Sequence, residues 1–183
     1  MDAVAAAFDA FPREGFLPEP ERHRAPYDGP IPIGGGQTNS QPRTVEAMLR
    51  LLDVRPGQRV LDVGTGSGWT TALLAHLTGP SGEVVGVELE GDLVEFGSAN
   101  LGRTGQPWAS IRRAEVGVLG WPGAAPYHRV LVSAEPRELP DELVDQLTDD
   151  GVMVIPVNGT MLRVANPGRR VSRHGGYRFV PLR

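Results

Sequence analysis

The chain has 183 residues, of which 40% are hydrophobic and 22% charged, a composition typical of a globular protein with one core. It contains no cysteine, which excludes disulfides, thiolate metal sites and a cysteine nucleophile, and no lysine, which excludes a Schiff-base or P-loop lysine. The net charge of −4 argues against a general nucleic-acid binder. No secretory leader and no apolar run of about 20 residues is visible, and the four histidines are scattered. We therefore expect a cytoplasmic protein without a membrane span or a metal site.

The first 54 residues alternate between helix-forming and turn-forming sequences. Asp2–Ala10 is alanine-rich and compatible with a helix. Residues 12–36 are dense in proline and glycine, which predicts a loop that wraps around the rest of the domain. Arg43–Val54 carries apolar residues at helical spacing and predicts a helix. The stretch IPIGGGQTNSQPRT, from Ile31 to Thr44, suits neither a regular helix nor a regular strand.

From residue 59 onward, short β-branched runs alternate with helix-like segments. The expected strands are Arg59–Val63, Glu83–Val87, Trp108–Arg112, Arg129–Ser133, Val152–Ile155, Met161–Val164 and Tyr177–Val180. The expected helices are Trp69–Leu77, Leu93–Leu101 and Asp141–Leu147. This alternation predicts an α/β fold with a doubly wound, mostly parallel sheet, and the late strands predict an antiparallel edge. The short basic cluster of Arg169, Arg170 and Arg173 predicts a solvated loop.

The strongest local signal is VLDVGTGSGWTTALLA, in which Gly64, Gly66 and Gly68 lie between an expected strand and an expected helix. Glycines there allow positive φ angles and let a ligand approach the backbone, and the start of the helix adds N–H donors. A dinucleotide fingerprint would need a third glycine at the position of Trp69, which disfavours NAD or FAD. The pattern is D-x-G-x-G-x-G from Asp62, the form seen in class I S-adenosylmethionine-dependent methyltransferases. The carboxylate of Asp62 would suit an ammonium group or a water network.

A second carboxylate stands at the end of the next expected strand. Glu88 follows Asp62 by 26 residues (88 − 62), and an acidic residue there can accept both hydroxyls of a ribose. The alternative is a glycine-rich turn with two surface carboxylates and no ligand.

The segments IPIGGGQTNSQPRTVEAML and LLDVRPGQRVLDVGTGSGWTTALLA together resemble the protein-L-isoaspartate O-methyltransferases. PREGFLPE upstream, and LGWP, VIPV and RFVPLR downstream, also fit, so the resemblance covers almost the whole chain. It implies one domain over residues 1–183, with a wrapping segment and substrate loop in 1–44 and a cofactor-binding core of class I methyltransferase fold in 45–183. It also implies S-adenosylmethionine as the cofactor, a peptide or protein carrying isoaspartate as the substrate, no nucleic-acid partner, and a monomer.

The resemblance also implies roles for individual residues. Ser40 falls on the family's active-site serine, although it could instead cap the helix that follows. The expected substrate-binding residues are Ile33, Gly34, Gln37, Thr38 and Asn39. The expected cofactor-binding residues are Asp62, Gly64, Thr65, Gly66, Ser67, Gly68, Glu88, Leu89, Glu115 and Val116.

The sequence departs from the family pattern at several of these positions. Val116 stands where the family usually has an aspartate that reads the adenine amino group, and Glu115 is its neighbour. In the ungapped register we expect Val116 to pack on the purine and Glu115 to point to solvent. Asn39 replaces an isoleucine, Glu135 an alanine, and Thr160 a glutamine that often contacts the cofactor. We expect Asn39 and Glu135 near the mouth of the pocket.

The leading interpretation is an enzyme that methylates the α-carboxylate of isoaspartyl residues in damaged proteins, after which the ester cyclises to a succinimide. One alternative is a family relative that methylates an aspartate of a dedicated peptide to form an aspartimide. Another is a non-catalytic relative that binds cofactor without turnover. A nucleic-acid methyltransferase is disfavoured because the charge is acidic and no base-methylation motif is present.

Overall fold

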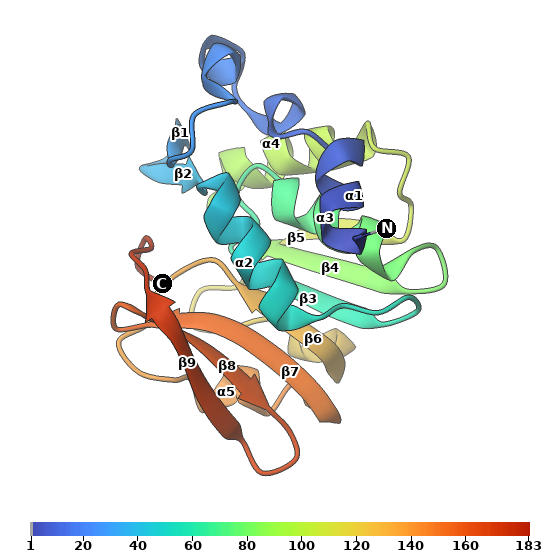
Figure 1. Ribbon diagram of the computed structural model, residues 1–183, viewed down its shortest axis with the longest axis vertical. Coiled ribbons are helices and arrows are strands. Elements are labelled where there is room, and N and C mark those ends of the chain that lie inside the picture. Colours follow the sequence, from blue (N-terminus) through green and yellow to red (C-terminus); the bar gives the residue numbers. More distant parts are fainter. Residues whose placement is uncertain (1) are drawn as a thin grey trace.

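The computed structural model describes residues 2–183, and a seven-stranded sheet forms its centre (Figure 1). The strands run in the order β5-β4-β3-β6-β7-β8-β9. They are β3 (Arg59–Val63), β4 (Glu83–Glu88), β5 (Ala109–Arg113), β6 (Tyr127–Val132), β7 (Leu147–Val157), β8 (Thr160–Ala165) and β9 (Arg170–Gly176). All neighbouring pairs from β5 to β7 in this order are parallel, and the pairs β7–β8 and β8–β9 are antiparallel. The predicted α/β fold, with a mostly parallel sheet and an antiparallel edge, is confirmed.

Helices cover both faces of this sheet. They are α1 (Ala3–Ala10), α2 (Pro42–Leu52), α3 (Trp69–Thr78), α4 (Gly91–Gly102) and α5 (Asp141–Val144), with short 3-10 helices η1 (Arg13–Phe16), η2 (Glu19–Arg24) and η3 (Pro122–Ala124). Successive strand residues face opposite sides, so Val60 packs in a cluster with α1, α2 and α3, whereas Leu61 packs with α5. No helix within residues 2–183 is long and apolar enough to cross a bilayer.

The proline- and glycine-rich stretch expected as a loop contains regular structure. Besides η1 and η2, it includes β1 (Ile31–Gly34), which pairs antiparallel with β2 (Gln37–Asn39). Ile31 and Ile33 are buried, and Pro32 and Gly34 between and after them are exposed, which is the alternation of a half-buried strand. We call residues 31–40 the substrate hairpin from here on, after the role that the sequence predicts for them.

Two late elements differ from the sequence prediction. The helix expected to reach Leu147 ends at Val144, because β7 begins at Leu147 and runs for 11 residues. Tyr177–Val180 is not a strand, and the last strand is instead β9, formed by Arg170–Gly176. This edge strand is largely exposed and carries arginines, which protect a sheet edge from pairing with other chains. The arginines predicted to form a solvated loop therefore lie largely in a strand.

Candidate functional site

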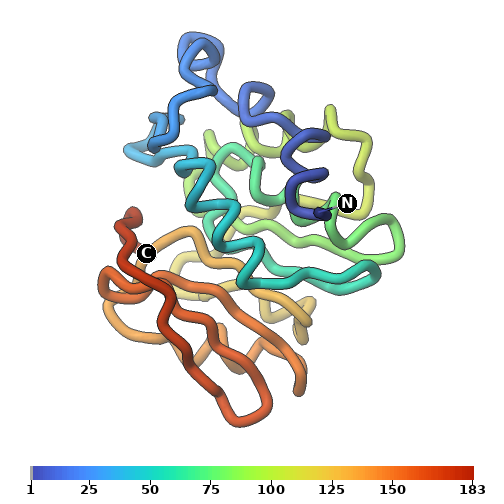
Figure 2. The backbone as a smooth tube through the Cα atoms, in the orientation of Figure 1, coloured from blue at the N-terminus to red at the C-terminus, as the bar shows by residue number. Residues whose placement is uncertain are grey.

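A cleft that opens to solvent lies at the carboxyl ends of β3, β4 and β6, and its empty space, with the open solvent at the mouth included, is about 920 Å³. Ligands bind in this position in open α/β sheets, where the strand order reverses. Segments that lie far apart in the chain line the cleft: residues 37–40, 63–67, 87–89, 114–115, 118–120, 133–134 and 180–183 all contribute. Figure 2 shows the last residues of the chain on the same side of the molecule as the substrate hairpin.

The floor of the cleft is the glycine turn between β3 and α3. Gly64, Gly66 and Gly68 all have positive φ angles, of 80°, 52° and 82°, which residues with a Cβ rarely adopt. A Cβ on Gly66 would also lie 2.9 Å from Cδ1 of Ile33, so the substrate hairpin packs directly on the turn. Ile33 is thus buried between its own hairpin and the glycine turn, and neither Ile33 nor Gly34 lines the cleft.

Glu88 ends β4 and presents a fixed carboxylate to the cleft. The side chain is 7% exposed. Its Oε2 accepts a hydrogen bond from the N–H of Gly66 (2.9 Å), and its Oε1 accepts from the N–H groups of Leu89 (2.8 Å) and Glu90 (3.0 Å). Three donors compensate the charge and occupy both lone pairs of Oε1 but leave one free on Oε2, so the carboxylate can still accept a hydroxyl group of a ligand.

Asp62 lies behind the glycine turn and does not line the cleft. It is fully buried, and its Oδ2 accepts hydrogen bonds from the hydroxyls of Thr70 and Thr71, both 2.7 Å away, in the first turn of α3. Burial raises the pKa of Asp62 to about 6. Asp62 therefore holds the helix start against the sheet. The buried atoms Asp62 Oδ1 and Thr65 Oγ1 have no partner among the described residues.

The substrate hairpin contributes Gln37, Thr38, Asn39 and Ser40 to the cleft. Ser40 is half-buried. The alternative of a helix cap does not hold for Ser40, because Gln41 occupies the N-cap position of α2 and makes no capping hydrogen bond. Asn39, expected near the mouth, is buried and points into the protein.

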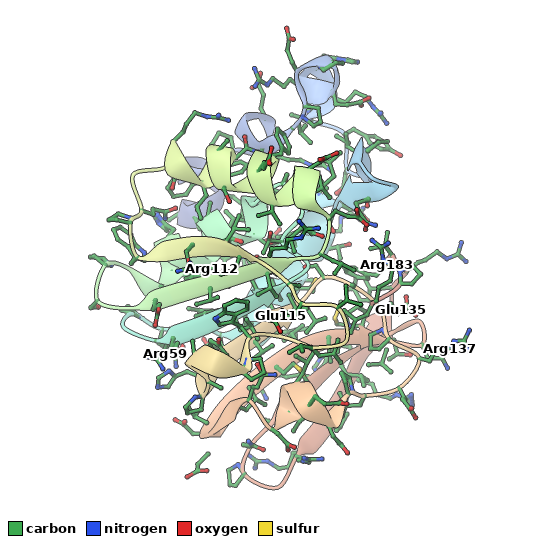
Figure 3. The ribbon with its side chains drawn as sticks, turned by 180° about the vertical axis from the view of Figure 1, so that it is seen from behind. Arg59, Arg112, Glu115, Glu135, Arg137 and Arg183 are labelled. Carbon is green, nitrogen blue, oxygen red and sulfur yellow. The ribbon has the colours of Figure 1, made fainter. Side chains whose placement is uncertain are left out.

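The loop after β5 places Val116 differently from the ungapped expectation, whereas Glu115 is exposed, as expected. Glu115 is among the residues that line the cleft, whereas Val116 is not and is 89% exposed. Glu115 is labelled in Figure 3, which views the molecule from behind. In this geometry Glu115, rather than Val116, is the residue available to a ligand.

Glu135 and Thr160 do not line the cleft. The carboxylate of Glu135 accepts hydrogen bonds from the backbone N–H groups of Gly159 (2.5 Å) and Phe179 (3.1 Å). It thereby ties the loop after β6 to the β7–β8 turn and to the C-terminal segment.

Sequence reasoning missed the C-terminal segment as a part of the site. Val180, Pro181, Leu182 and Arg183 line the cleft, and Arg183 forms an ion pair of 2.5 Å with Glu90. The backbone N–H of Leu182, the residue before Arg183, donates to the carbonyl oxygen of Glu135 (3.0 Å), and Figure 3 labels both Arg183 and Glu135. The RFVPLR motif was the available signal, but the partner of Arg183 lies 93 residues away in the chain.

A glycine turn and a strand-terminal glutamate, together at the reversal point of a mostly parallel sheet, define a class I S-adenosylmethionine-dependent methyltransferase. The family model of protein-L-isoaspartate (D-aspartate) O-methyltransferase matches residues 1–183, and the chain belongs to this family.

Relatives and solved structures agree with this assignment. A protein-L-isoaspartate O-methyltransferase of Methanopyrus kandleri is 43% identical over 98% of this chain and 82% of its own length. That of Methanothrix thermoacetophila is 42% identical over 99% of this chain and 88% of its own. The crystal structure of a Plasmodium falciparum protein assigned to the same family, in complex with S-adenosyl-L-homocysteine, superposes with a TM-score of 0.90. It is 27% identical and covers 100% of this chain and 91% of its own.

Proposed function

We propose that this protein transfers a methyl group from S-adenosylmethionine to the α-carboxylate of isoaspartyl residues in peptides or proteins. The observation that carries the proposal is that Gln37–Ser40 of the substrate hairpin and the glycine turn line one cleft. Family membership supports the same chemistry.

The residues of the cleft fit S-adenosylmethionine. The glycine turn lets a ligand approach its backbone closely, because Gly66 has no side chain and has no room for a Cβ beside Ile33. The carboxylate of Glu88 suits ribose hydroxyls. Leu89, Glu115, Thr65 and Ser67 complete the proposed cofactor set within the cleft. Asp62, Gly64 and Gly68 support the turn, and Val116, exposed outside the cleft, is no longer in the set that we propose.

When bound, S-adenosylmethionine supplies a methyl group to a carboxylate oxygen, and the S–C bond breaks as the O–C bond forms. A peptide α-carboxylate has an ordinary pKa of about 3.5, so it is ionised at neutral pH and the site needs no general base. The substrate hairpin then has two tasks: to orient the carboxylate and to exclude water. Orientation alone can lower a barrier by roughly 7–11 kcal/mol in favourable cases.

Ser40 is the residue that we propose to contact the reacting carboxylate. It is half-buried at the inner end of the substrate hairpin, where its hydroxyl can donate a hydrogen bond to an oxygen. An isoaspartyl α-carboxylate and an aspartyl side-chain carboxylate differ in position more than in basicity. A fixed hairpin can therefore distinguish them by geometry.

The structure weakens the support for the two alternative functions, a dedicated-peptide enzyme and a non-catalytic relative. The polar Asn39, in place of an isoleucine, would favour a dedicated-peptide aspartimide enzyme, but this side chain is engaged inside the protein. Val116, in place of the family's aspartate, would favour a non-catalytic relative, but Glu115 supplies a carboxylate to the cleft. We retain as parts of the proposal that residues 1–183 act as one methyltransferase domain, as a monomer, in the cytoplasm and without a nucleic-acid partner.

The test is transfer of a tritiated methyl group to an isoaspartyl peptide and to its aspartyl isomer. We expect labelling of the isoaspartyl form well above the other, and Ser40→Ala should lower turnover more than cofactor affinity. Ser98→Ala, an exposed serine on α4, is the matched control. Equal labelling of the two isomers, or none of either despite cofactor binding, would refute the proposal.

A further inference from the structure

Arg13, the first residue of η1, is a buried cation beneath the substrate hairpin. It is 5% exposed, and its guanidinium donates five hydrogen bonds to neutral oxygens. Four reach the carbonyl oxygens of Tyr27 (2.8 Å), Gly29 (2.7 Å), Asn39 (2.9 Å) and Ser40 (3.0 Å). These acceptors lie before β1 and at the end of β2, so one side chain holds both ends of the substrate hairpin.

The fifth hydrogen bond of Arg13 fixes the side chain of Asn39. Nε of Arg13 donates to Oδ1 of Asn39 at 2.6 Å. Because a guanidinium can only donate, the oxygen of the Asn39 amide must face Arg13, and its NH₂ group must face the other way. That NH₂ group donates to the hydroxyl of Ser67, 2.9 Å away.

Ser67 belongs to the glycine turn and is itself held in place. It is 2% exposed and lines the cleft. Its carbonyl oxygen accepts a hydrogen bond of 2.9 Å from the side chain of Asn100, on α4. An unbroken path of hydrogen bonds thus runs from Arg13 through Asn39 to the turn that forms the floor of the cofactor cleft.

We propose that Asn39 is a positioning residue that couples the substrate hairpin to the glycine turn, so that occupancy of the cofactor site stabilises the hairpin. The inference rests on the proposed function. Asn39 directly precedes Ser40, so any shift of its amide moves the serine relative to the cleft. Coupling between two sites is reciprocal, and a correctly placed hairpin therefore also favours cofactor binding.

An apolar residue of similar size cannot make either bond. Asn39→Leu should leave the guanidinium of Arg13 short of one acceptor and separate the hairpin from Ser67. Asn39→Asp is the conservative rescue, because its carboxylate accepts from Arg13 and can accept from the Ser67 hydroxyl. Asn166→Leu is the matched control: Asn166 donates to the carbonyl oxygen of Thr148 and does not line the cleft.

The experiment measures amide hydrogen exchange of residues 31–40 with and without S-adenosylhomocysteine. In the wild type and in Asn166→Leu, we expect the ligand to slow exchange by about fivefold or more. In Asn39→Leu the slowing should be less than about twofold, with recovery in Asn39→Asp. Turnover of Asn39→Leu should fall roughly tenfold, and its Kd for S-adenosylhomocysteine should rise by up to about fivefold, the factor that reciprocal coupling sets.

Equal slowing in the wild type and Asn39→Leu, or no slowing in the wild type, would overturn the coupling. If Asn39→Leu does not fold, Ser67→Ala carries the same comparison, because it removes the acceptor while Arg13 and Asn39 remain. Failure of the proposed function has a different signature: exchange responds to the ligand as expected, yet no isoaspartyl peptide is methylated.

Discussion

The carboxylate of Glu88 and the backbone N–H of Gly66 are joined by a hydrogen bond of 2.9 Å, which ties the end of β4 to the middle of the glycine turn. The same carboxylate accepts from Leu89 and Glu90. It therefore shapes the cleft and, in our proposal, also binds the ribose of the cofactor.

Replacing Glu88 by glutamine should impair both roles. The amide keeps one acceptor oxygen, but its NH₂ group must then face at least one backbone N–H. A lost hydrogen bond to a charged group costs roughly 1.5–3 kcal/mol, so calorimetry should show about tenfold or weaker binding of S-adenosylhomocysteine. Glu83→Gln, at the exposed start of the same strand, is the control and should leave binding unchanged. Unaltered affinity in Glu88→Gln would contradict the assignment.

Truncation of Glu115 should weaken cofactor binding, whereas truncation of Val116 should not. Because Glu115 lines the cleft and Val116 is 89% exposed, we expect Glu115→Ala to weaken S-adenosylhomocysteine binding by about fivefold. Val116→Ala should leave the Kd within about twofold, as for other surface substitutions. An inosyl analogue, which lacks the adenine amino group, should bind both variants alike if Glu115 accepts from that group. A larger loss in Val116→Ala would restore the ungapped expectation.

Asp62 should make the stability of the protein depend on pH. Its pKa is raised by burial to about 6 from an ordinary 3.8, so between these values the folded chain keeps a proton that the unfolded chain releases. The contribution of Asp62 to the free energy of unfolding therefore falls by about 3 kcal/mol in total as pH rises from about 4 to about 6. Above about pH 6 this contribution no longer changes with pH. Asp62→Asn removes this dependence.

Urea unfolding of both proteins between pH 4 and pH 8 gives the measurement. The stability of Asp62→Asn relative to the wild type should rise by about 3 kcal/mol across the window and then level off. Other carboxylates cancel in this difference. A difference that does not change with pH would show that Asp62 is not buried as a perturbed acid.

Arg183 should influence which peptides are accepted. It is the only basic residue among the described residues that line the cleft, and Glu90 pairs with it at the rim, where both side chains are partly exposed. An acidic residue beside the isoaspartyl group can displace Glu90 and take its place. We expect acidic neighbours to lower KM by about threefold over neutral ones at low salt, and less at high salt.

Arg183→Gln should abolish this preference, and Arg178→Gln, an exposed arginine outside the cleft lining, should retain it. The comparison uses isoaspartyl peptides with acidic, neutral and basic neighbours. If the wild type prefers basic neighbours instead, the charge of Glu90 rather than that of Arg183 dominates the rim.

The sequence predicted the parts of the site that local patterns encode. The strand, turn and helix around Gly64–Gly68 and the acid at Glu88 each have a signal within a few residues. β9 escaped prediction because an exposed edge strand needs no alternation of apolar side chains. The bond from Arg13 to Asn39 and the pair of Arg183 with Glu90 join residues 26 and 93 positions apart, and no local pattern reports such contacts.

The order of the cleft-lining segments also has a consequence for the protein during its synthesis. They begin at residue 37 and end at residue 183, and the central strand β3 needs β6 beside it, about 70 residues later. A ribosome-bound chain that has exposed only the glycine turn therefore lacks one wall of the cleft. Cofactor can stabilise the finished molecule but cannot guide its early folding, so nascent chains depend on their own core until translation has passed residue 183.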